Sequence, residues 1–175
     1  MKNKKNTDEP IKYYNNLRTD VLELLPNKLS KILEAGCGEG FTGEEAKKRT
    51  GAEITGIELF NDAAEKARTR LDKVIVGNLE LIELDFPNEY FDCIIYADVL
   101  EHLKNPENVL IKHREKLNDN GYIIASIPNI QYIRPVLSIL FDKLEYAEAG
   151  ILDRTHLRFF TLHTIKKCSQ ILVLK

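Results

Sequence analysis

Residues 34–40 place three alternating glycines directly after the carboxylate of Glu34, in the segment Glu-Ala-Gly-Cys-Gly-Glu-Gly. Glycine leaves the backbone N–H groups accessible and lets a ligand approach the chain closely. The apolar run at 31–35 predicts a buried strand, and residues 41–50 predict a helix. A glycine-rich turn between a strand and a helix favours a nucleotide-like cofactor. Taken alone, the glycines are also consistent with an ordinary tight turn.

The spacing of these glycines discriminates between two classes of cofactor. A dinucleotide site requires G-x-G-x-x-G, in which the third glycine allows the helix to pack closely on the strand. After Gly36 and Gly38, Phe41 occupies that third place. The bulky ring argues against a nicotinamide-dependent oxidoreductase, which stays as an alternative function for this type of sheet.

Polar residues follow the next two predicted strands. Glu58 ends the strand at 53–58, where a carboxylate can accept hydrogen bonds from both hydroxyls of a ribose. Asn78 follows the strand at 73–76, and its amide can hydrogen-bond the edge of an adenine. Because the carboxyl ends of parallel strands meet at one edge of a sheet, we expect both residues beside the glycine-rich segment. A surface glutamate at a strand end is the plainer interpretation of Glu58.

A third polar group, Asp98-x-x-Glu101-His102, follows the fourth predicted strand. Imidazole titrates near neutral pH, so His102 is the candidate general base. Its alternative is a structural role at the start of a helix. Asp98, Glu101 and His102 are also chemically suited to a divalent ion, with His156 or His163 as a fourth ligand. We favour a site without a metal.

Strands and helices alternate along the chain, and the strands are apolar almost throughout. This pattern predicts an α/β fold, a Rossmann-like doubly wound and mostly parallel sheet with helices on both faces. Residues 1–30 are expected to form a tail and an amphipathic helix, and residues 31–175 one domain. The expected strands are 31–35, 53–58, 73–76, 91–97 and 121–127, and the expected helices are 11–25, 41–50, 61–71, 106–117 and 130–146, followed by a loop at 147–162.

Four motifs in the right order resemble the class I S-adenosylmethionine-dependent methyltransferases. They are the E-x-G-x-G-x-G segment, Glu58-Leu59-Phe60, Gly77-Asn78-Leu79, and the stretch from Asp85 to Leu103, so the resemblance covers residues 31–128. It implies S-adenosylmethionine as cofactor and S-adenosylhomocysteine as product. The family usually has aspartate where this chain has Asn78, which leaves the adenine contact without a charge. The cofactor-binding residues that the resemblance implies are Glu34, Gly36, Cys37, Gly38, Gly40, Phe41, Glu58, Leu59, Asn78, Leu79, Ala97, Asp98 and Val99.

Residues 13–18 and 150–161 resemble bacterial methyltransferases that occur alongside glycosyltransferases in cell-surface polysaccharide pathways. This narrower resemblance implies methyl transfer to a small-molecule or sugar-like acceptor. A solvated loop anchored by Phe159 and Phe160 is the structural alternative. The residues expected to meet the acceptor are Arg154, His156 and Arg158.

Composition narrows the class of partner. The 175 residues suit one domain, and the net charge of −2 gives no electrostatic reason to expect nucleic acid or an anionic membrane. No apolar run is long enough to span a bilayer. Three scattered cysteines do not suggest a disulfide framework or a zinc site, which favours reduced thiols and a cytoplasmic location. We therefore expect a small-molecule acceptor, no nucleic acid and no membrane as partners.

The end of the chain departs from the family. Class I methyltransferases resemble a seven-stranded sheet closed by a C-terminal hairpin, and residues 168–175 lack the expected Gly-Phe. We expect the last one or two strands to be missing, as a change of reading frame would explain. A bare sheet edge would then allow a homodimer. A cofactor-binding domain without catalytic activity is a further alternative function.

Overall fold

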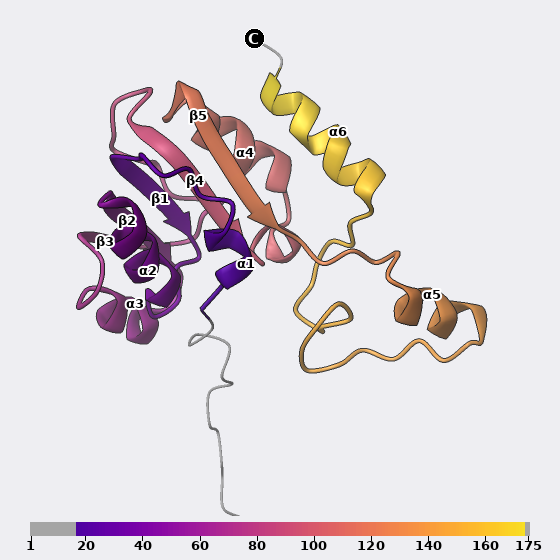
Figure 1. Cartoon of the computed structure of the whole chain (residues 1–175). Coiled ribbons are helices and arrows are strands. Elements are labelled where there is room, and N and C mark those ends of the chain that lie inside the picture. The colour runs from indigo at the N-terminus through magenta and orange to yellow at the C-terminus, as the bar shows by residue number, and fades with distance from the viewer. Residues whose placement is uncertain (1–16, 174–175) are drawn as a thin grey trace, which may run out of the picture.

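The computed structural model describes residues 17–173 and shows five parallel strands in the order β3-β2-β1-β4-β5 (Figure 1). The order reverses between β1 and β4, which is where doubly wound sheets bind their ligands. The expected α/β, Rossmann-like sheet is therefore confirmed. The elements are α1 (Thr19–Leu22), β1 (Lys31–Ala35), α2 (Phe41–Thr50), β2 (Glu53–Glu58), α3 (Asn61–Ala67), β3 (Lys73–Val76), β4 (Phe91–Ala97), the 3-10 helix η2 (Leu100–His102), α4 (Pro106–Arg114), β5 (Leu117–Ser126), α5 (Ile133–Leu140) and α6 (Leu162–Val173).

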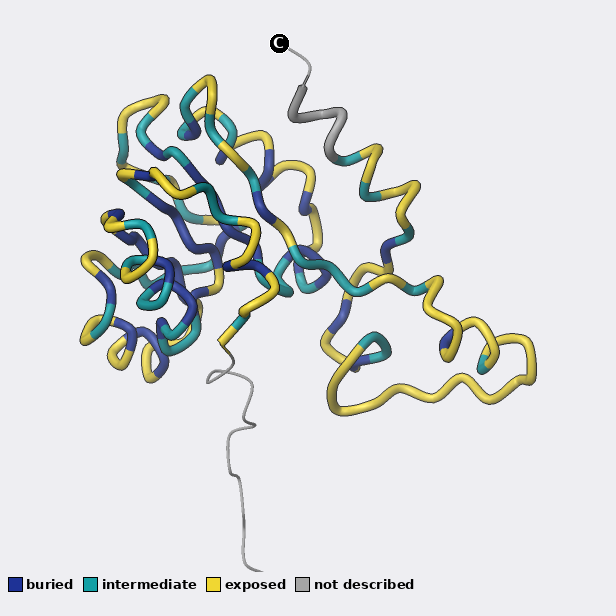
Figure 2. Tube along the Cα trace, viewed as in Figure 1, coloured by how far each residue is buried: buried dark blue, intermediate teal, exposed yellow. Residues whose placement is uncertain are grey.

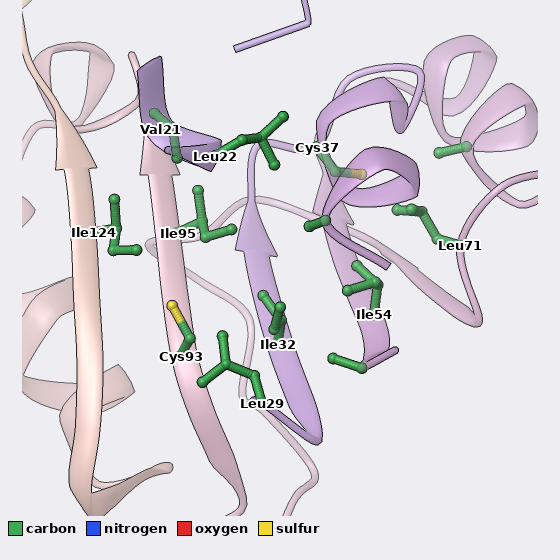
Figure 3. Packing of buried hydrophobic residues seen from close by; sticks show 13 residues of the cluster. Val21, Leu22, Leu29, Ile32, Cys37, Ile54, Leu71, Cys93, Ile95 and Ile124 are labelled. Atoms are coloured by element: carbon green, nitrogen blue, oxygen red, sulfur yellow. The ribbon is translucent and has the colours of Figure 1, made fainter. Parts of the chain in front are cut away.

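Two hydrophobic clusters cover the two faces of this sheet. Alternate residues of a strand point to opposite faces, so Ile32 belongs to one cluster and Leu33 to the other. Figure 3 shows the first cluster, in which Val21 and Leu22 of α1 lie over the sheet. Val109 of α4 belongs to the second cluster. The two-sided burial explains why the central strands are apolar almost throughout.

Several expected element boundaries were wrong, and local contacts explain them. The helix expected at 11–25 is only α1 among the described residues, and residues 11–16 lie outside them. Pro26 disfavours a helical conformation of the residue before it, so α1 does not extend to that point. The expected helix 106–117 ends earlier because Leu117 pairs with Phe91 and begins β5. The strand expected at 121–127 therefore starts four residues earlier.

The remaining differences lie at the ends of α3 and α5. The expected helix 61–71 ends at Ala67, and residues 68–71 continue as hydrogen-bonded turns. The helix expected at 130–146 is only α5, because the N–H of Ile130 donates to the carbonyl of Phe160 and holds the segment before the helix in another conformation. Asp142, with a positive φ of 54°, follows the end of α5.

Residues 129–161, called the arm below, leave the body of the molecule after β5 and return before α6. An isolated parallel bridge joins Asn129 to Phe160 at the base of the arm. Figure 1 shows α5 standing away from the sheet, and Figure 2 shows that most of the arm is exposed. No helix among residues 17–173 combines the length and the apolar character needed to cross a bilayer.

Candidate functional site

The glycine loop, residues 36–40, connects β1 to α2 at the carboxyl end of the sheet. Gly36, Gly38 and Gly40 have φ values of +69°, +55° and +85°, a region that favours glycine. At Gly36 a side chain is also excluded by space, because a Cβ atom there would lie 2.7 Å from a methyl group of Val99. The loop is therefore held in one shape by both its backbone conformation and its neighbours.

Glu58 connects this loop to the end of β2. Its carboxylate accepts hydrogen bonds from the backbone N–H of Gly38 and of Phe60, each at 2.9 Å. The side chain is buried and contributes to the wall of the adjacent cavity. A carboxylate has room for about four hydrogen bonds, so two bonds to the backbone leave acceptor capacity for a ligand. The expectation that Glu58 would lie beside the glycine loop is confirmed.

A cavity of about 1470 Å³ opens along the carboxyl ends of the strands. Its wall includes all but two of the residues implied as cofactor-binding, from Glu34 at the end of β1 to Val99 after β4. The exceptions are Gly40 and Phe41. Gly40 faces Ala67 of α3, and the Phe41 ring lies under the guanidinium of Arg70 at 4.1 Å. Both shape the loop from behind the cavity wall.

Glu34 lies beneath the glycine loop and is fully desolvated. Burial raises the pKa of its carboxyl to about 8, so the group is mostly protonated near neutral pH. Its Oε2 atom has no hydrogen-bond partner among the described residues. A Cβ atom at Gly43 would lie 2.6 Å from this oxygen, so the absence of a side chain there makes room for the carboxyl.

The end of β4 carries a second polar group, built around Asp98. Asp98 has a positive φ of 55°, and its Oδ1 accepts a hydrogen bond from the Ser126 hydroxyl at 3.1 Å. The guanidinium of Arg18 pairs with Asp98 and donates to the Ser126 hydroxyl at 2.6 Å. Arg18 was not predicted as a site residue, and the resemblance of residues 13–18 to related methyltransferases is the only sequence signal that includes it. All three residues line the cavity.

His102, the candidate base, lies in η2 on the part of the cavity wall that contacts the arm. Its Nδ1 atom is 3.2 Å from the carbonyl oxygen of Thr155. A carbonyl can only accept, so Nδ1 carries the proton of the neutral ring and Nε2 is the unprotonated nitrogen. Burial is the main cause that lowers the pKa of His102 below its usual 6.5. The neutral, basic form therefore dominates at pH 7.

Glu101 and His156 lie next to this histidine. The rings of His102 and His156 are 4.8 Å apart in an edge-on arrangement, and Nε2 of His156 is 4.0 Å from the Glu101 carboxyl. His156 Nδ1 lies 3.1 Å from the Ile151 carbonyl, which assigns its proton in the same way. Burial raises the pKa of Glu101 to about 8. From the sequence, both residues were predicted as possible metal ligands and His156 also as an acceptor contact, but their mutual contact was not predicted.

Ligand atoms of Glu101, His102 and His156 all lie within 4.8 Å of one another. Two imidazoles with their Nδ1 protons held by backbone carbonyls, together with one carboxyl group, are suited to a divalent ion. Asp98 is outside this group, and so is the exposed His163 on α6. Five residues were considered as metal ligands from the sequence. A divalent ion stays an alternative at three of them, namely Glu101, His102 and His156.

The basic residues of the arm do not all reach the cavity. Arg154 lines it and also bonds Glu148 at 2.8 Å, and His156 lines it from the arm. Arg158 lies outside the lining and donates to the carbonyl of Lys104. One of the two phenylalanines that follow is buried and the other is exposed, so only Phe160 serves as an anchor.

Known proteins resemble this chain in both sequence and fold. The mitochondrial ubiquinone biosynthesis O-methyltransferase of Schizosaccharomyces pombe is 32% identical over 115 residues, which is 62% of this chain and 42% of that protein. The Actinobacillus pleuropneumoniae ubiquinone biosynthesis O-methyltransferase is 30% identical over 132 residues, 69% of this chain and 56% of that protein. The chain thus spans about half the length of these curated relatives.

Solved structures agree in fold. A SAM-dependent methyltransferase from Archaeoglobus fulgidus aligns with a TM-score of 0.66 and 21% identity, covering 83% of this chain and 61% of that one. The plantazolicin methyltransferase, solved in complex with SAH, aligns with a TM-score of 0.62 and 20% identity over 80% of this chain and 54% of that one. A family model described as a methyltransferase domain matches residues 11–170. The chain therefore belongs to the methyltransferase domain family, within the class I S-adenosylmethionine-dependent methyltransferases.

Proposed function

We propose that this chain is an S-adenosylmethionine-dependent methyltransferase that acts on a small-molecule or sugar-like acceptor. The observation that carries the proposal is the cavity itself, where the glycine loop and Glu58 on one side face His102 and the arm on the other. A cofactor and an acceptor can thus meet in one cavity, which methyl transfer between two bound molecules requires.

The residues of the β1–β3 side fit the proposed cofactor. Gly36 and Gly38 put no side chain between the backbone and the cavity, and Glu58 has acceptor capacity for ribose hydroxyls. Asn78 and Leu79 border the place for an adenine. When bound, S-adenosylmethionine supplies an electrophilic methyl group on a sulfonium and leaves as S-adenosylhomocysteine. The remaining implied contacts are Glu34, Cys37, Leu59, Ala97, Asp98 and Val99 on the wall, with Gly40 and Phe41 behind it.

His102 is the proposed catalytic residue. Its Nδ1 proton is directed to the Thr155 carbonyl, so Nε2 is the basic nitrogen that would accept a proton from an acceptor hydroxyl. The lowered pKa keeps the imidazole unprotonated at pH 7. Arg18 and Asp98 form an ion pair at the same end of the sheet, and we assign them a positioning role.

Partners and location belong to the same proposal. The outer edge of β5 is unpaired within the described sheet, and a second copy could pair there to form a homodimer. Cys37, Cys93 and Cys168 are thiols in the structure, which is consistent with a cytoplasmic protein. A role in cell-surface polysaccharide synthesis is supported by the sequence resemblance of residues 13–18 and 150–161.

The experiment is a calorimetric titration of the whole chain with S-adenosylhomocysteine. We expect binding by the wild type, at least tenfold weaker binding by Glu58→Gln because a charged acceptor is lost, and no binding of NAD. Glu53→Gln, an exposed glutamate at the start of β2, is the matched control and should bind normally. Equal binding by both variants would refute the assigned site. Binding without methyl release to any acceptor would favour the non-catalytic alternative.

A further inference from the structure

The charges on the cavity wall are unequal. Seven carboxyl groups and two guanidinium groups line the cavity, and no lysine among the residues that the structure describes does so. Both guanidiniums are already in ion pairs. Arg18 pairs with Asp98. Arg154 pairs with Glu148 at 2.8 Å. A phosphate or carboxylate on the acceptor would therefore meet carboxyl groups and no unpaired guanidinium, which opposes its binding.

Two of these carboxyl groups lie where the arm meets η2. Glu101 is 1% exposed and Asp153 is 4% exposed, and both line the cavity. Neither oxygen of the Glu101 carboxyl has a hydrogen-bond partner among the described residues. Asp153 uses one oxygen, Oδ1, to accept from the backbone N–H and the hydroxyl of Thr155. Because a buried polar group without a partner is costly, the Glu101 carboxyl indicates that a hydrogen-bond donor is missing from this place.

The two histidines at the same place add hydrogen-bond acceptors. Nδ1 of His102 and Nδ1 of His156 each lie against a backbone carbonyl, so each neutral ring presents Nε2 as an acceptor. Ligand atoms of Glu101 and both histidines lie within 4.8 Å of one another. An ammonium group has three N–H donors and no acceptor, and its hydrogen bonds of about 2.8 Å span acceptors at such distances. This part of the wall therefore matches an ammonium group in both hydrogen bonding and charge.

We propose that the methyl acceptor carries an ammonium group, which Glu101, Asp153 and His156 recognise at the junction of η2 and the arm. This inference rests on the proposed function and narrows its small-molecule or sugar-like acceptor to a cationic amine, such as an amino sugar. Glu101 and His156 supply hydrogen-bond acceptors, and the Asp153 carboxylate supplies negative charge. Both oxygens of Glu101 are closed to water, so the ammonium group reaches them as the arm adjusts around the acceptor.

The chemistry of the junction distinguishes an ammonium group from a metal ion. A carboxyl group must be ionised to bind a metal, whereas an ammonium also donates to the carbonyl oxygen of a protonated carboxyl. Neighbouring ligands of a tetrahedral zinc ion lie about 3.4 Å apart, since each bond is about 2.1 Å long. Nε2 of His156 and the Glu101 carboxyl are 4.0 Å apart, which is wider than such a metal site.

The test uses three probes that share one sugar ring and differ in charge. Glucosamine carries an ammonium group at pH 7, glucose is neutral, and glucuronate carries a carboxylate. Each probe is titrated calorimetrically into the whole chain saturated with S-adenosylhomocysteine, with and without a chelator. We expect glucosamine to bind at least tenfold more tightly than glucose and glucuronate to bind more weakly than glucose, because hydrogen bonds between charged groups are the strong ones. The chelator should leave these affinities unchanged.

Three variants assign the preference to the junction. Asp153→Asn keeps an oxygen for Thr155 and removes the charge, so the preference for glucosamine over glucose should fall at least fivefold. Glu101→Leu removes both carboxyl oxygens and should abolish the preference. Glu145→Gln is the matched control, because Glu145 is an exposed residue of the arm outside the cavity lining, and it should behave like the wild type. Unchanged affinity for S-adenosylhomocysteine establishes that each variant is folded.

Three results would overturn the proposal. Glucosamine and glucose would bind equally or not at all, the preference would survive in both Asp153→Asn and Glu101→Leu, or the chelator would abolish it. The last result would assign the junction to a metal ion. Failure of the proposed function is a separate outcome, because a chain that does not bind S-adenosylhomocysteine refutes the assigned cofactor site. A chain that binds S-adenosylhomocysteine and ignores the charge of the probe refutes only the ammonium site.

Discussion

The two walls of the cavity are built on different principles. The glycine loop is fixed from within, by positive φ angles, by close contacts such as Gly36 with Val99, and by hydrogen bonds to Glu58. The arm is fixed from outside, at its base by the Asn129–Phe160 bridge and near its return by the carbonyl of Glu101, which accepts from Leu157 and Arg158 at 2.8 and 3.0 Å.

This difference indicates that the two walls have different functions. A wall with a close-packed backbone has one fixed shape. Such a wall suits the cofactor, which is the same in every reaction. A wall attached by a few hydrogen bonds has low local stability and can vary in shape and sequence at little cost to the fold. We therefore expect the loop side to determine cofactor binding and the arm side to determine which acceptor is used.

The largest difference in stability between the two walls is expected for two glycines with similar backbone conformations. Gly36→Ala should lower the free energy of unfolding by about 2–5 kcal/mol, the sum of left-handed strain and overpacking against Val99. Gly150→Ala, in the arm at φ +90° with no atom within 4 Å of the new Cβ, should cost only about 1–2 kcal/mol. Urea unfolding measures both values. Equal losses would show that the arm is packed as tightly as the loop.

A smaller effect is expected from the buried carboxyl on the arm side. Glu101 has a pKa of about 8 when folded and an ordinary value of 4.5, so between these pH values the unfolded chain releases a proton that the folded chain retains. Stability from this group is full below pH 4.5 and is lost as the pH rises to 8. At roughly 1.4 kcal/mol per pKa unit, Glu101→Gln should be more stable than the wild type at pH 8 by about 4 kcal/mol.

Glu34→Gln is the matched variant on the loop side, because burial raises the pKa of Glu34 to about 8 as well. The stability difference between each variant and the wild type is measured by urea unfolding at pH 5 and at pH 8. The stability difference is expected to grow with pH for both variants. If it grows for Glu34→Gln but not for Glu101→Gln, water reaches the arm side and Glu101 is ionised there.

The smallest expected effect is that of metal removal. Glu101 must lose its proton to bind a cation, and its raised pKa opposes this at pH 7. We expect a chelator to leave the rate of methyl transfer unchanged. Loss of activity with chelator and recovery with manganese would instead show that Glu101, His102 and His156 hold an ion.

The pH dependence of the rate tests His102 as the base. We expect the rate of methyl transfer to fall as the pH drops below 6.5 and His102 becomes protonated. His102→Gln should remove this pH dependence.

The difference between the glycine-loop wall and the arm wall also explains which features could be predicted from the sequence. The parallel sheet and the positions of Gly36 and Glu58 follow from short-range patterns, namely apolar strands ending in glycine or acid, and these were correct. The contact of Glu101 with His156 joins residues 55 positions apart through a segment without regular structure, and no periodicity encodes it. Arg18 was overlooked because its ion pair with Asp98 forms only when the chain before β1 folds back over β4 and β5.

Glu101 connects the cavity to the arm, and from this we predict an order of binding. Its side chain faces the cavity, while its peptide carbonyl carries the two hydrogen bonds that retain the arm. A ligand that restrains Glu101 therefore also restrains the backbone at Leu157 and Arg158. We expect an ordered sequence, in which the cofactor enters first and slows amide exchange at these two residues before the acceptor arrives.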